Sequence, residues 1–167
     1  QRAFFEVFGF LYLPGLFADD IARISAHFDA LFRQHEVDVV HWVHETHENR
    51  LRRFISRPTA KDEYLGSLVH DSRIREVAAF LLGSAYEFTG SDASIYDCGT
   101  VFHQDGHGVA KPQCLNLKMA LYLDPVGESS GAIRLIPGSH HPGDKFSARL
   151  NRDLFLGKDK LGLQTEE

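Results

Sequence analysis

The sequence is poor in cysteine: it has two, Cys98 and Cys114, and neither belongs to a Cys-x-x-Cys pair. Two separate cysteines make no disulfide framework and no zinc or redox motif, and they fit a reducing, cytoplasmic compartment. The sequence also lacks a run of about 18 apolar residues and a charged segment followed by an apolar one. We therefore expect neither a membrane span nor a signal peptide.

Clusters of basic residues are scarce as well. Arg50, Arg52 and Arg53 form the one concentrated group, and the formal net charge is -5. A nucleic-acid partner is not expected, because a surface that binds the phosphate backbone needs a basic patch. Apolar residues make up 43% of the 167 residues and charged residues 25%, which is ordinary for a globular protein. We expect one domain over residues 1–167, long enough to bury a core.

Hydrophobic periodicity divides this domain into a helical layer at about 1–84 and a strand-rich part at about 85–167. Helices are predicted at 1–8, ended by Gly9, at 20–34, at 64–68 and at about 72–82, ended by Gly83. Short strands are predicted at 10–13, 86–89, 93–96, 100–103, 115–123 and 132–136, and a further helix at 146–155. The His-rich segment 35–53 is interpreted as a polar surface region or lid that borders substrate.

The segment from Thr100 to Gly108, Thr-Val-Phe-His-Gln-Asp-Gly-His-Gly, contains the strongest chemical signal. On a strand, residues two apart point to the same side, so His103 and Asp105 would aim an imidazole nitrogen and a carboxylate oxygen at one point. Two histidines and one carboxylate with open positions form the ligand set of non-haem Fe(II) oxygenases. His103 and Asp105 are therefore candidate metal ligands, and a third ligand must come from elsewhere. His107 would share their face only if the strand continued through Gly106.

Two downstream blocks support this interpretation: Lys-Met-Ala-Leu-Tyr-Leu-Asp-Pro at 118–125 and Gly-Ala-Ile-Arg-Leu-Ile-Pro-Gly-Ser-His at 131–140. Together with His-Gln-Asp, they make the sequence resemble the phytanoyl-CoA dioxygenase family of Fe(II)/2-oxoglutarate oxygenases over roughly residues 1–150. The resemblance implies an α+β fold with a mainly β core, in which N-terminal helices back a double-stranded β-helix, a jelly-roll barrel of the cupin type. It also implies Fe(II) as the metal, 2-oxoglutarate as cosubstrate, dioxygen, and a small or medium-sized organic substrate. The carboxylate of Asp105 favours hydroxylation, since family relatives that halogenate have a small residue there.

The polar face of the predicted strand 115–123 would line the mouth of such a barrel. The odd-numbered residues of this strand are all apolar, and the even-numbered ones are mixed. Asn116, Lys118 and Tyr122 are therefore candidates for contacting 2-oxoglutarate or substrate. A strand surface that faces solvent explains the same pattern equally well.

Two functional residues of the family have no matching position: the distal His ligand and the Arg that pairs with the far carboxylate of 2-oxoglutarate. His140 follows His103 on a later strand end, but in the family this histidine is not the distal ligand, so a structural or pocket-edge role is favoured. We therefore expect a barrel that is incomplete at its C-terminus and a chain that is part of a longer protein. The 167 residues alone would then show no 2-oxoglutarate turnover.

Two other functions are compatible with the sequence. One is a non-catalytic, cupin-like binding domain that keeps the fold and part of the metal site. The other is a cupin-type metalloenzyme that uses His103, Asp105 and His140 with another metal and without 2-oxoglutarate. The sequence leaves the substrate and the oligomeric state open.

Overall fold

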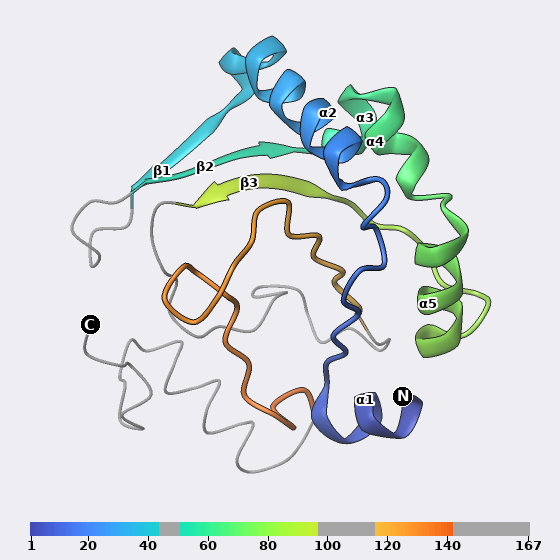
Figure 1. Ribbon diagram of the computed structural model, residues 1–167. Helices are drawn as coiled ribbons and strands as arrows, with labels where there is room; N and C mark the ends of the chain where they lie inside the picture. Colours follow the sequence, from blue (N-terminus) through green and yellow to red (C-terminus); the bar gives the residue numbers. More distant parts are fainter. Residues whose placement is uncertain (44–50, 97–115, 142–167) are drawn as a thin grey trace. The chain divides into compact units, whose positions relative to one another are not determined.

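The computed structural model describes residues 1–43, 51–96 and 116–141 (Figure 1). The chain divides into two compact units, each described here by itself. The larger unit consists of Leu13–Gly99 and Leu117–Ala132, and the smaller one of Gln1–Tyr12, Thr100–Asn116 and Ile133–Glu167. No helix in the described ranges is long and apolar enough to cross a bilayer.

The helices of the larger unit begin and end at local signals in the sequence. The long helix α2 (Ile21–Gln34) buries Ile24 and Leu31, which lie seven residues apart and so on one face. Helix α4 (Glu63–Leu68) is capped by Asp62, whose carboxylate accepts a 2.8 Å hydrogen bond from the Leu65 N–H. Helix α5 (Ser72–Leu82) is capped in the same way by Asp71. The short helices η1 (Glu36–Asp38) and α3 (Pro58–Lys61) complete the set in the described part of this unit.

The sheet of the larger unit has three antiparallel strands in the order β1-β2-β3. They are β1 (Val40–Val43), β2 (Leu51–Ser56) and β3 (Asp92–Tyr96). Ile55 on β2 pairs with Ala93 on β3, and both side chains are buried in the core. Arg52 and Phe54 point to the opposite face of β2, because side chains alternate along a strand. One face of the sheet therefore packs against helices, while the other carries polar and aromatic groups.

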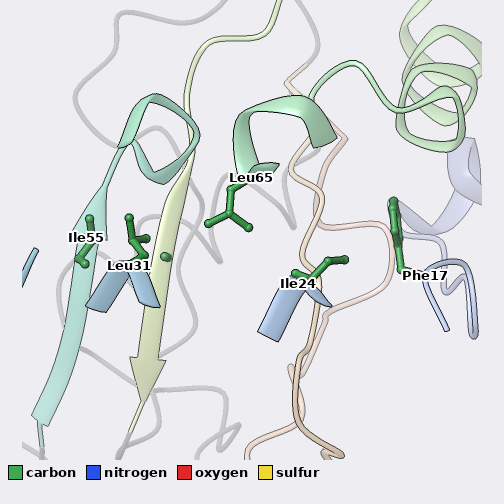
Figure 2. Close-up of a cluster of buried hydrophobic side chains, with 6 residues drawn as sticks. Phe17, Ile24, Leu31, Ile55 and Leu65 are labelled. Carbon is green, nitrogen blue, oxygen red and sulfur yellow. The ribbon is translucent and has the colours of Figure 1, made fainter. Parts of the chain in front are cut away.

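The core of the larger unit forms where this sheet face meets the helices. Leu31 is 1% exposed and Ile55 is 0% exposed, and Figure 2 shows both in the cluster. Among the described residues, this cluster consists of Phe17, Ile24, Leu31, Ile55, Leu65 and Ala93. Leu123, from the downstream segment, packs against this cluster. The core thus joins α2, α4 and the sheet to residues far along the chain.

The predicted helices at 1–8, 20–34, 64–68 and 72–82 are confirmed, with α1 (Arg2–Phe8) as the first. The predicted strand at 93–96 is confirmed as β3. The interpretation of 35–53 as an irregular polar region is wrong in part, because β1 and much of β2 lie there. Within the described residues, no strand is assigned to 10–13, 86–89, 116–123 or 132–136, so those strand predictions are wrong for this structure. An alternating pattern makes a strand only where a neighbouring strand pairs with it.

The fold class is therefore confirmed in its coarse form, with helices packed on a small antiparallel sheet. The predicted strand at 100–103 and the predicted helix at 146–155 lie outside the described residues. The single domain over residues 1–167 stays a prediction.

Candidate functional site

The predicted iron ligands His103 and Asp105, and also His107, lie outside the described residues. Across 1–43, 51–96 and 116–141, no three His, Cys, Asp or Glu side chains gather in a way that could hold a metal ion. The described part of the chain therefore offers no alternative metal centre. The two ligands stay a prediction that rests on their chemistry and spacing.

The predicted cosubstrate contacts lie on a described segment. Asn116, Lys118 and Tyr122 are all exposed, and Tyr122 is 44% exposed. Leu117, Met119 and Leu123 between them are partly buried, so most of the predicted two-faced pattern holds without an assigned strand. Leu121 is the exception at 37% exposed. The roles of Asn116, Lys118 and Tyr122 in binding stay a prediction.

The Pro-Gly-Ser-His turn packs against the C-terminal end of α1 within the smaller unit. The Nε2 atom of His140 lies 3.1 Å from the carbonyl oxygen of Glu6, and the Nε2 atom of the neighbouring His141 lies 3.3 Å from that of Val7. The N–H of Gly138 donates to the carbonyl oxygen of Phe8 at 3.1 Å. Three carbonyls at the end of α1, which have no partner inside the helix, are satisfied by one turn.

Gly9 makes this packing possible. Its φ of 81° is the left-handed conformation that ends α1, and a Cβ atom built on it would lie 2.3 Å from Nδ1 of His140. That Nδ1 atom is buried and has no hydrogen-bond partner among the described residues. Both nitrogens of His140 are thus closed to a metal ion, one by a carbonyl and one by Gly9. These contacts favour the structural role of His140 over the role of iron ligand.

Arg73 connects the start of α5 to the segment before α2, and no feature of the sequence predicted this role. Its guanidinium lies 2.7 Å from both Asp71 and Asp20, donates to the Leu16 carbonyl at 3.1 Å and stands 4.0 Å from the centre of the Phe17 ring. Hydrogen bonds from Arg73 lower the pKa of Asp71 to about 2, against the opposing effect of burial. The same contacts raise the pKa of Arg73. No local pattern signals this network, because Leu16 and Arg73 are far apart in sequence.

The basic group of the hairpin divides between the two faces of the sheet. Arg52 donates to Asp92 at 3.1 Å and to Ser94 at 3.0 Å, and its guanidinium lies 4.7 Å from the Phe54 ring centre and 4.9 Å from that of Tyr96. Arg53, the next residue, pairs with His41 and points to the helix side. The two described arginines therefore serve different surfaces.

A sheet backed by helices, with a His-x-Asp segment downstream, is compatible with the class of non-haem Fe(II) oxygenases. The model of the phytanoyl-CoA dioxygenase family matches residues 5–161. The chain therefore belongs to this family, which implies a double-stranded β-helix fold and indicates an Fe(II)/2-oxoglutarate oxygenase. Searches of curated proteins and of solved structures gave no match.

Proposed function

We propose that this protein is an Fe(II)/2-oxoglutarate-dependent dioxygenase that hydroxylates a small or medium-sized organic substrate. The observation that carries the proposal is the family match over residues 5–161, which includes His103, Asp105 and the Pro-Gly-Ser-His turn. The retained carboxylate at position 105 supports hydroxylation, because it fills a coordination position that a halide would otherwise need.

His103 and Asp105 are the residues that would hold the iron. Imidazole nitrogen and carboxylate oxygen are the donors that non-haem Fe(II) takes, so the donor set fits the metal. When bound, Fe(II) would activate dioxygen, which is the oxidant. One oxygen atom would enter the substrate C–H bond as C–OH, and the other would enter 2-oxoglutarate, which would be converted to succinate and carbon dioxide. His140 is not included in the set, since its nitrogens are engaged at Glu6 and Gly9.

Residues of the segment 116–123 contribute binding and orientation in this proposal. The positive charge of Lys118 suits a carboxylate of 2-oxoglutarate, and Asn116 and Tyr122 add hydrogen-bonding groups. All three side chains are exposed, while Leu123 fixes the segment to the core of the larger unit. The exposed polar side chains are therefore accessible to a cosubstrate, while the packing of Leu123 holds the segment in place.

The test is an anaerobic titration of the protein with Fe(II) and 2-oxoglutarate, monitored by the visible charge-transfer band of the iron chelate. We expect a saturable band that requires both components and is lost in His103→Ala and Asp105→Ala. His70→Ala is the matched control, because His70 is an exposed histidine of the larger unit, and it should leave the band unchanged. Far-UV circular dichroism of each variant checks folding.

The alternatives give different results in the same assay. A band in wild type that survives in His103→Ala would refute the assigned ligands. Binding of Fe(II) without any effect of 2-oxoglutarate would favour a cupin-type metalloenzyme. Absence of metal binding would favour the binding-domain reading.

A further inference from the structure

A cavity of about 370 Å³ lies beside the C-terminal end of α2, on the helix side of the sheet. Helix α2, the connection to β1, and strands β1 and β2 supply its walls, all within the larger unit. Its volume is within the range of cavities that hold one small molecule. Its lining consists of Phe32, Arg33, Glu36, Val39, His41 and Arg53.

The basic side chains of this cavity have no acidic partner in the part of the chain that the structure describes. In the described ranges, no ion pair or side-chain hydrogen bond involves Arg33, His41 or Arg53. Glu36 lines the same cavity without pairing to any of them, and the nearby Asp38 is already bound by Lys61 and His35. In a chain with a net charge of -5, unpaired arginines that meet in one cavity are unusual. Their charge is available for a ligand.

The register of the hairpin brings two hydrogen-bonding side chains of this cavity together. His41 and Arg53 are direct cross-strand partners, so their side chains leave the sheet on one face. An anion placed between them would accept hydrogen bonds from both side chains. Arg33, in the last turn of α2, offsets the partial negative charge of the helix end, which would otherwise repel an anion.

We propose that this cavity binds the phosphate group of a small phosphomonoester. Two guanidinium groups match the charge of nearly -2 that such a group carries at neutral pH, and the planar donor fork of Arg suits its oxygens. Phe32 and Val39 provide an apolar wall for the organic part of the ligand. Glu36 opposes the anion and sets a limit on affinity. Binding here requires neither iron nor 2-oxoglutarate and stands apart from the proposed function.

The test is isothermal titration of the full chain with phenyl phosphate, in a buffer free of phosphate and sulfate. We expect saturable binding of one equivalent, weakened about tenfold or more in Arg33→Gln and in Arg53→Gln, as fits loss of a hydrogen bond to a charged group. Glu36→Gln should bind more tightly than wild type. Arg75→Gln is the matched control and should change nothing, because Arg75 is an exposed arginine that lines a second cavity, beside α5.

Three results would overturn the proposal. One is the absence of saturable binding in the wild type with its circular dichroism spectrum intact. Another is an equal loss in Arg75→Gln, which would show a general effect of positive charge. The third is an equal affinity for inorganic phosphate, which would rule out the apolar wall and leave a site for the free ion alone.

Discussion

The packing of His140 against Gly9 predicts a large and specific cost for Gly9→Ala. Two effects add. The first is the left-handed backbone at φ 81°, which costs an L-residue about 1–2 kcal/mol. The second is the new methyl group, placed 2.3 Å from the Nδ1 atom of His140, which costs about 1–3 kcal/mol as overpacking. We expect a total loss of about 2–5 kcal/mol in the free energy of unfolding.

Gly15→Ala separates the two effects. Gly15 has nearly the same φ, 75°, but no atom lies within 4 Å of the Cβ position, so this variant should lose only the backbone part. Urea unfolding would give the free energies, with the slope m checked for constancy. In the double variant Gly9→Ala/His140→Ala the clash is absent, so Gly9→Ala should cost about 1–3 kcal/mol less there than in wild type. Equal costs for Gly9→Ala and Gly15→Ala would refute the packing described here.

Two further predictions concern the larger unit. Leu31→Ala should lower the free energy of unfolding by about 2–5 kcal/mol, because it opens a cavity in the core. The control Val37→Ala, at a position 96% exposed, should change this free energy by about 0.5 kcal/mol or less. Similar urea midpoints for the two variants would contradict the core assignment. The ion pair of Asp71 with Arg73 should make the free energy of unfolding depend on pH. Because the pKa of Asp71 is lowered from 3.8 to about 2 in the folded protein, the pair contributes its full stabilisation above pH 3.8 and loses it as the pH falls from 3.8 to about 2. Urea midpoints measured against pH should show this loss, of about 1 kcal/mol or less, in wild type and not in Asp71→Asn.

The helices could be predicted because their signals are local. The Asp71 carboxylate accepts a hydrogen bond from the Arg73 N–H at the start of α5, and Gly83 at φ 89° ends the helix twelve residues after Asp71, so one short stretch of sequence contains both ends. The apolar spacing of Ile24 and Leu31 likewise identified the buried face of α2. Such features depend on residues within a few turns of one another.

The sheet was predicted less well because a strand depends on its partners. The sequence of the His-rich segment 35–53 indicates a polar surface region, yet β1 and the first half of β2 lie in it, and their pairing makes the hairpin. The segment 116–123 has the clearer alternation and still forms no assigned strand in the described structure. Pairing decides whether such a segment forms a strand, and the second partner of β2, strand β3, lies far along the sequence, where no local pattern of β2 reveals it.

The candidate site shows the same division between chemistry and packing. The His-x-Asp motif indicates an iron site by its donor atoms alone. The Pro-Gly-Ser-His turn is equally distinctive, but in this structure it packs against the C-terminal end of α1. His140 reaches across 134 positions to the carbonyl of Glu6, and it can do so only because Gly9 lacks a side chain. A motif that identifies a family of metalloenzymes thus includes a histidine that, in this chain, contacts the end of α1.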